Sequence, residues 1–165
     1  MKRWLRFTAA VLAAAFLFAL TGCGSSTNSA SFTWFVDSIP ANLDPQVASG
    51  ASDVIACENL YGTLVRKDPD GELVPGLCEK WTVSSDGLTY TFTLKDGLTY
   101  AAVKGTATEY DITAEDFVFA FRRIFRADTA SPYAVDFSAI QNSAAVQAGL
   151  ADESSLGVSA NGPLT

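Results

Sequence analysis

Histidine is absent from all 165 residues of the sequence. Its absence excludes Ser-His-Asp and Cys-His nucleophilic sites, and it excludes zinc sites built on imidazole. Only carboxylates remain as general acids or bases, and the adjacent Glu115 and Asp116 are better explained by the start of a helix. Asp68 and Asp70 precede Gly71 as in a calcium loop, but the later acidic ligands of such a loop are missing. We therefore expect no enzymatic activity, no metal site and no cofactor.

Basic side chains are also scarce, with 11 lysines and arginines against 18 aspartates and glutamates. Three of them, Lys2, Arg3 and Arg6, lie at the very start, so the rest of the chain has eight basic and 18 acidic residues, a formal charge of −10. Binding to nucleic acid requires clustered lysine and arginine to neutralise phosphates. The composition therefore argues against a nucleic-acid partner.

The one long apolar run, residues 8–20, follows this basic start. It is too short to cross a bilayer comfortably, which takes about 20 apolar residues. Leu20-Thr21-Gly22-Cys23 comes next, with small residues directly before a cysteine. We therefore expect residues 1–22 to be a lipoprotein signal peptide, and residues 23–30 to be a lipidated Cys23 with a flexible polar tether. An ordinary cleaved signal peptide is the alternative, but it would leave Cys23 without a role.

Cys57 and Cys78 are the other two cysteines of the sequence. An exported protein can form disulfides, so a bridge between them is possible in principle. Two small buried thiols are the simpler interpretation, and we favour it.

Residues 73–126 carry the densest structural signal, which begins with a β-hairpin. Apolar and polar residues alternate over residues 88–95, as in a half-buried strand. A second strand is expected over residues 81–84, and Asp86-Gly87 between the two is a hairpin turn. Before it, Val74-Pro75-Gly76-Leu77 predicts a further turn, set by the proline and the glycine.

A helix is expected to begin at Thr113, which can act as its N-cap with Asp116 at the reciprocal position of a capping box. An apolar stripe then recurs at helical spacing. It consists of Phe117, Ala120, Phe121, Ile124 and Phe125. The aromatic residues of the hairpin and the helix follow strand and helix periodicity, so we expect a core and not a ligand site. These residues are Trp81, Tyr90, Phe92, Phe117, Phe119, Phe121 and Phe125.

Shorter signals predict the remaining elements, which are expected to complete an α/β chain. They are a strand over residues 32–36, a helix over residues 52–61 capped by Ser52, a short strand at residues 64–65 ending in a turn at residues 68–71, a helix over residues 142–147, and a strand over residues 156–160 before the turn Asn161-Gly162.

Residues 73–126 contain a series of short sequence motifs in a fixed order. The motifs are Val-Pro-Gly-Leu, Glu-Lys-Trp, Ser-Asp-Gly-Leu-Thr-Tyr-Thr-Phe-Thr-Leu-Lys-Asp-Gly and Thr-Ala-Glu-Asp-Phe-Val-Phe-Ala-Phe-Arg-Arg. This series resembles the N-terminal part of family 5 of the extracytoplasmic solute-binding proteins, the dipeptide- and oligopeptide-binding lipoproteins of ABC importers. The resemblance runs from Leu43-Asp44-Pro45 to about Leu156-Gly157-Val158. It implies an α/β, type II periplasmic-binding-protein-like fold of the peptide-binder class. Residues 31–165 would be its truncated N-terminal portion, incomplete without the second lobe.

The resemblance also implies a function, namely the capture of oligopeptides or dipeptides for delivery to an importer. The partners would be a peptide ligand, the permease subunits and the membrane, through the lipid on Cys23. The protein would be a monomer on the extracytoplasmic face of the cell membrane. Same-family binders of nickel chelates, haem or oligosaccharides are alternatives, and a structural or adhesive surface lipoprotein is an alternative from another class.

The resemblance finally implies a ligand-binding segment. In the family, the loop after Leu-Asp-Pro borders the cleft, and its backbone pairs with the extended peptide by strand addition. Counting from that motif, Ser49, Gly50 and Ala51 would occupy this loop, where small side chains allow close backbone approach. An ordinary helix-capping loop is an equally simple interpretation of these three residues.

Overall fold

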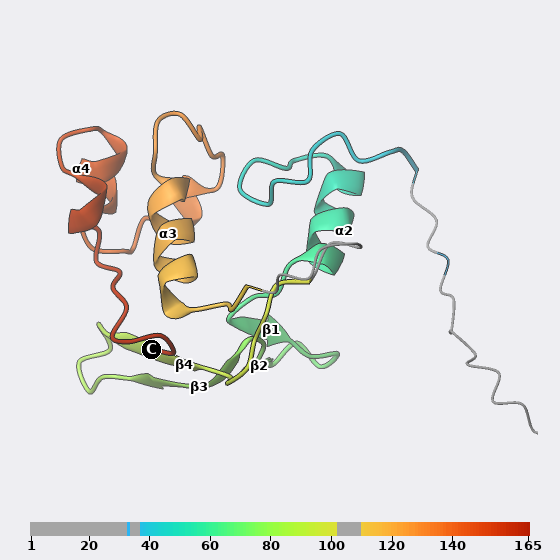
Figure 1. Ribbon diagram of the computed structural model, residues 1–165. Coiled ribbons are helices and arrows are strands. Elements are labelled where there is room, and N and C mark those ends of the chain that lie inside the picture. The colour runs from blue at the N-terminus through green and yellow to red at the C-terminus, as the bar shows by residue number, and fades with distance from the viewer. Residues whose placement is uncertain (1–32, 34–36, 102–109) are drawn as a thin grey trace, which may run out of the picture. The chain divides into compact units, whose positions relative to one another are not determined.

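The computed structural model describes residue 33 and residues 37–101 and 110–165 (Figure 1). The chain divides into two units, Met1–Phe35 and Val36–Thr165, and every element below lies in the second unit. The expected signal peptide, Cys23, the tether and, apart from Thr33, the expected strand over residues 32–36 fall outside the described residues.

Among the described residues, two antiparallel hairpins and an isolated bridge between Thr99 and Asp111 form the β structure of this unit. In the first, β1 (Val65–Lys67) pairs with β2 (Leu73–Pro75). In the second, β3 (Cys78–Val83) pairs with β4 (Tyr90–Leu94). The Ser84 amide donates to the Thr89 carbonyl at 2.9 Å to close the second hairpin. The hairpin expected at Asp86-Gly87 is therefore confirmed.

The prediction of a turn over residues 74–77 is wrong for residues 74 and 75. Leu73–Pro75 is a strand whose register places Pro75 opposite Val65 at the open end of the first hairpin. Proline is tolerated at such a strand end because no ladder hydrogen bond is required of it there. After β2 the chain stays close to the residue that precedes β1, because the Gly76 and Cys78 amides both donate to the Leu64 carbonyl, at 3.0 and 3.1 Å.

Helix α3 (Ala114–Ile124) begins where the sequence predicts, with Thr113 and Asp116 forming the capping box. The Asp116 carboxylate accepts from the Thr113 amide at 2.7 Å and from its hydroxyl at 3.0 Å. The end of α3 contributes to the main buried cluster. This cluster consists of Ile124, Phe125, Ala134, Val146 and Leu156, with Phe121, Tyr133, Phe137, Ile140, Ala151 and Val158 packed against it.

The aromatic core that the sequence predicts is only partly present. Phe125 is buried and Phe121 packs edge-on against Phe137, with ring centroids 5.6 Å apart. Tyr90 and Phe119, however, are 59% and 54% exposed. Tyr90 is the first residue of β4, directly after the turn of the second hairpin.

Short elements complete the unit after α3. The 3₁₀ helix η1 (Ala134–Phe137), α4 (Ser143–Gln147) and the 3₁₀ helix η2 (Glu153–Ser155) follow one another. The expected helix at residues 142–147 is confirmed. The strand expected over residues 156–160 is wrong, because Leu156 is buried in the cluster and Gly157 donates its amide to the Gln141 carbonyl at 2.9 Å.

Helix α2 (Ala51–Leu60) matches the expected helix to within a residue at each end. Its N-cap is Gly50, so the expected cap at Ser52 is wrong. Ser52 lies in the first turn, and its hydroxyl oxygen is 2.9 Å from that of Ser38. Cys57 of this helix and Cys78 are both buried free thiols, as we expected. None of the described helices is long and apolar enough to cross a membrane.

Candidate functional site

The Leu-Asp-Pro motif folds into a turn that leads into α2. The Asp44 carbonyl accepts from the Val47 and Ala48 amides at 3.1 and 2.8 Å. The Asp44 carboxylate accepts from the Gln46 amide at 3.0 Å, which is the local bonding expected of an aspartate in a turn. One residue therefore satisfies three successive amides and directs the chain toward the helix.

Ser49, Gly50 and Ala51, the expected ligand-binding residues, follow this turn directly and are all exposed. Gly50 has φ −72° and ψ 147°, an extended conformation close to polyproline II. Within residues 37–101 and 110–165, neither the amide nor the carbonyl of Ser49 takes part in a hydrogen bond. These backbone groups are therefore accessible to an incoming ligand, and the role of the three residues stays a prediction.

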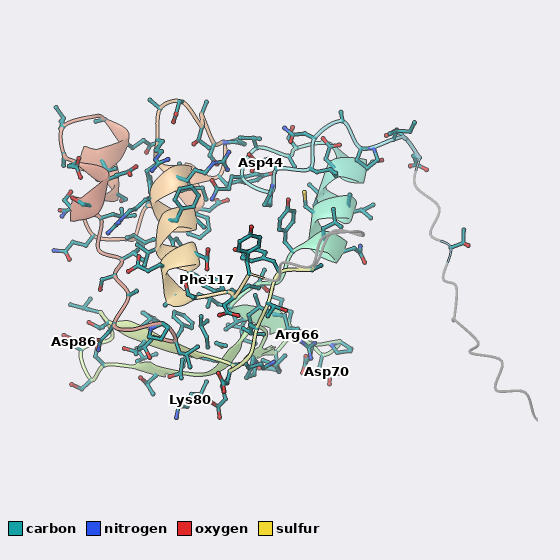
Figure 2. The ribbon with its side chains drawn as sticks, viewed as in Figure 1. Asp44, Arg66, Asp70, Lys80, Asp86 and Phe117 are labelled. Atoms are coloured by element: carbon teal, nitrogen blue, oxygen red, sulfur yellow. The ribbon has the colours of Figure 1, made fainter. Side chains whose placement is uncertain are left out.

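Asp44, which is labelled in Figure 2, is attached to the rest of the unit by Arg123 of α3. Its guanidinium forms a bidentate pair with the Asp44 carboxylate, through bonds of 3.0 and 2.5 Å. The same guanidinium donates to the Gln46 side-chain oxygen at 2.8 Å. A bidentate arginine–carboxylate pair fixes orientation as well as distance.

Three further contacts hold the same turn. The Gln46 side-chain amide donates to the Ala120 carbonyl of α3 at 2.7 Å. Beyond α3, the Ser131 hydroxyl donates to the Gln46 carbonyl at 2.6 Å, and the Tyr133 hydroxyl donates to the Ala48 carbonyl. We call Asp44, Gln46, Arg123, Ser131 and Tyr133 the α3 clamp.

The α3 clamp was missed by the sequence analysis. Asp44 and Arg123 are 79 positions apart, and no local pattern links them. The one local signal is the run Arg122-Arg123 near the end of α3, for which the helix dipole is a sufficient explanation.

The ion pair changes the acidity of both partners. The hydrogen bond from Arg123 lowers the pKa of the Asp44 carboxyl, which the Gln46 amide also lowers and burial opposes. A carboxyl whose pKa is lower in the folded state stabilises the fold above its unfolded pKa, about 3.9, and that contribution disappears as the pH falls through the folded pKa.

We therefore predict a pH-dependent difference between the wild type and Asp44→Asn. The difference in their free energies of unfolding should be constant near neutral pH and should shrink below about pH 4, as Asp44 becomes protonated. Urea denaturation at a series of pH values measures it. A difference that stays the same down to the lowest pH would show that the Asp44 charge does not stabilise the fold.

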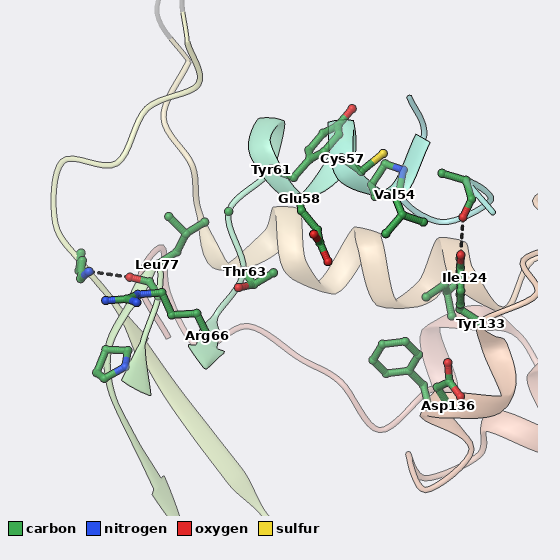
Figure 3. A pocket seen from close by; sticks show the side chains of 17 residues that line it. Val54, Cys57, Glu58, Tyr61, Thr63, Arg66, Leu77, Ile124, Tyr133 and Asp136 are labelled. Carbon is green, nitrogen blue, oxygen red and sulfur yellow. Dashed lines mark hydrogen bonds between the residues drawn. The ribbon is translucent and has the colours of Figure 1, made fainter. Parts of the chain in front are cut away.

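A groove with a volume of 1020 Å³ lies beside the clamp (Figure 3). Pro45 and Ala48 border it, next to the expected ligand-binding residues. Its apolar wall comes largely from α2 and from the segment after α3. The side chains of this wall are Val54, Cys57, Tyr61, Ile124, Tyr133 and Phe137.

Charged side chains also line the groove. They are Glu58, Arg66, Lys95 and Asp136, and the Lys95 ammonium donates to the Gly76 carbonyl at 2.5 Å. Among the described residues, no group of three potential ligands could hold a metal ion. The groove is therefore largely apolar with a few charges, as binding sites for small ligands commonly are.

Comparison with known proteins decides the family. The family model described as bacterial extracellular solute-binding proteins, family 5 Middle, matches residues 72–165. This chain belongs to that family. Members of family 5 are extracytoplasmic transport binders, so the resemblance seen in the sequence is confirmed.

Three family 5 relatives show the extent of the similarity. The chain is 37% identical over 123 residues to the periplasmic murein peptide-binding protein MppA of Escherichia coli, and 36% identical over 123 residues to the probable deoxycholate-binding periplasmic protein YgiS of the same species. Each match covers 73% of this chain. The crystal structure of Haemophilus influenzae OppA in complex with RPPGFSPFR matches with a TM-score of 0.65 and 29% identity over 76% of this chain.

The chain spans only 22% of the length of each of the first two relatives and 24% of the solved chain. Over that span the structure confirms the expected fold class, the α/β type II periplasmic fold of peptide-binding proteins.

Proposed function

We propose that this family 5 chain belongs to the substrate-binding component of a peptide ABC importer, which captures oligopeptides outside the cytoplasm and delivers them to the permease subunits. The observation that carries the proposal is the 37% identity to a murein peptide-binding protein over 73% of the chain. The absence of histidine and the open groove support a binding role without catalysis.

The segment that leads into α2, residues 44–51, which we call the α2 entry, gives this role a physical basis. The extended Gly50 and the free backbone groups of Ser49 can pair with an extended peptide as an added strand. Main-chain pairing supplies affinity for any sequence, because every peptide presents the same amide and carbonyl groups. The exposed Ala51 and Gly50 leave room for that backbone approach.

Peptide uptake tests this function in the cell of origin. We expect that an in-frame deletion of the codons for residues 37–165 abolishes uptake of radiolabelled oligopeptides and leaves uptake of free amino acids unchanged. Restoring the intact gene should restore peptide uptake. Unchanged oligopeptide uptake in the deletion strain would contradict the proposed function.

A second candidate ligand is an amphipathic molecule that is not a peptide. The 36% identity to a probable deoxycholate-binding protein favours it, since that relative matches this chain over the same share as the peptide binder. The same deletion strain distinguishes the two candidates. Loss of bile-acid uptake with normal peptide uptake would select the second candidate.

We further propose that Cys23 carries a lipid that anchors the protein to the membrane. Two acyl chains of a diacylglycerol contribute about 0.8 kcal/mol per buried CH₂, enough for stable anchoring. The other two cysteines, Cys57 and Cys78, are buried, so Cys23 is the expected site of modification.

Labelling with radioactive palmitate tests the anchor. We expect the protein in the membrane fraction to carry the label, Cys23→Ser to lose it, and the control Cys57→Ser to keep it. Mass spectrometry should show the modified Cys23 as the first residue. An unlabelled protein cleaved at another residue would contradict lipidation.

A further inference from the structure

We propose that Arg123 is a positioning residue for the ligand-binding segment. It would hold residues 49–51 in place through Asp44 and Gln46, without touching the ligand itself. This inference rests on the proposed function, because it assumes that residues 49–51 meet the peptide. It extends that function by naming the group on α3 that sets where the segment lies.

The geometry of the α3 clamp supports the proposal. Arg123 reaches two side chains of the turn at once, with its bidentate pair to Asp44 and a bond of 2.8 Å to Gln46. The Gln46 side-chain amide in turn donates to the backbone of α3 at 2.7 Å, so the turn has a second contact with this helix besides the guanidinium. A planar guanidinium fixes such an arrangement far better than a flexible ammonium does.

The clamp ends where the ligand-binding segment begins. The Tyr133 hydroxyl donates to the Ala48 carbonyl, and the Ala48 amide donates to the Asp44 carbonyl at 2.8 Å. The next residue, Ser49, makes no hydrogen bond within residues 37–101 and 110–165. A fixed residue therefore lies directly before one with unpaired backbone groups, an arrangement that lowers the conformational entropy lost when a ligand binds.

An ion pair of Arg126, which lies just after α3, provides a matched control. Arg126 pairs with the Glu153 carboxylate through bonds of 2.5 and 2.6 Å. Both pairs are similarly exposed, with side chains 32% and 30% exposed for Arg123 and Asp44 against 34% and 35% for Arg126 and Glu153. The difference lies in what they hold, since Glu153 belongs to η2 and not to the α2 entry.

Hydrogen exchange without any ligand tests the positioning role. The reporters are the Val47 and Ala48 amides, which donate to the Asp44 carbonyl. In Arg123→Met we expect both to exchange about three- to tenfold faster than in the wild type. In the control Arg126→Met these two amides should exchange at the wild-type rate.

The control has reporters of its own. The Ser155 and Leu156 amides donate to the Asp152 and Glu153 carbonyls, so their exchange should rise in Arg126→Met. Arg123→Lys keeps the charge but loses the bidentate fork, and we expect an intermediate rate at Val47 and Ala48. If Arg123→Met does not fold, the lysine variant decides the question.

Two results would overturn the proposal. The first is wild-type exchange at Val47 and Ala48 in both Arg123 variants. The second is an equal rise in Arg123→Met and Arg126→Met, which would indicate a general loosening of α3. Faster exchange at these amides with unchanged peptide uptake would instead contradict the ligand role of residues 49–51, so the two proposals fail in different ways.

Discussion

Replacing Phe125 by alanine should destabilise the protein by about 3 to 5 kcal/mol, the usual cost of deleting a large buried ring. Phe125 is 2% exposed and lies in the cluster with Ile124, Val146 and Leu156. Deletion of its ring removes packing from a cluster to which α3, η1, α4 and the residue after η2 all contribute. A loss of this size is a large share of the stability of an ordinary domain, about 5 to 15 kcal/mol.

The control for this prediction is Phe119→Ala, on the same helix. Phe119 is 54% exposed, and the central carbon of the Arg126 guanidinium lies 5.3 Å from its ring centre. We expect a cost below about 1 kcal/mol, since an exposed cation–π contact contributes little. Urea denaturation of both variants gives the two values. Similar losses in both would show that Phe125 does not lie in the core.

The second large effect is expected at Gly76. A Cβ built there would lie 2.3 Å from the Thr63 carbonyl oxygen and 3.1 Å from that of Leu64. Both are backbone atoms, so no side chain can move aside. The Gly76 amide also donates to the Leu64 carbonyl at 3.0 Å, and separating the segments would lose that bond. We expect Gly76→Ala to cost about 3 kcal/mol, at the upper end for overpacking.

Gly71→Ala is the matched control in the same hairpin. Gly71 has φ +86°, but a Cβ there would meet nothing within 4 Å. The cost should be only that of a left-handed conformation without steric contact, about 1 to 2 kcal/mol. Thermal unfolding followed by circular dichroism compares the two. If Gly71→Ala costs as much as Gly76→Ala, the close approach at Thr63 is not the cause.

Local chemistry explains which elements could be predicted. The Asp86-Gly87 turn and the Thr113 capping box depend on residues within a few positions of one another, so the sequence contains all the information that determines them. The same holds for the α2 and α4 helices. The family could also be recognised from the sequence, because its signature is a series of motifs in a fixed order and not a single residue.

The failures have a different physical origin. The strand expected over residues 156–160 had suitable alternation, yet Leu156 is buried by tertiary contacts in the main cluster, which override the local preference. Strand periodicity also predicts a core position for Tyr90, but periodicity cannot show that the turn end of the hairpin is left exposed.

The Arg123 to Asp44 pair joins parts of the chain 79 positions apart, and periodicity says nothing about such pairs. The candidate site depends on that kind of contact more than on local pattern. Sequence reasoning could therefore place Ser49, Gly50 and Ala51 by analogy, but it could not show what holds them.

Photo-cross-linking at Ser49 tests the central claim, that this segment meets a peptide, most directly. A photoreactive benzoylphenylalanine at position 49, which is exposed, should cross-link biotinylated RPPGFSPFR, the peptide bound to the Haemophilus influenzae relative. The same group at Ser85, exposed in the β3–β4 turn, serves as the control. The account predicts a cross-link at position 49 that excess unlabelled peptide removes, and none at position 85. Equal labelling at both positions, or none at position 49, would contradict it.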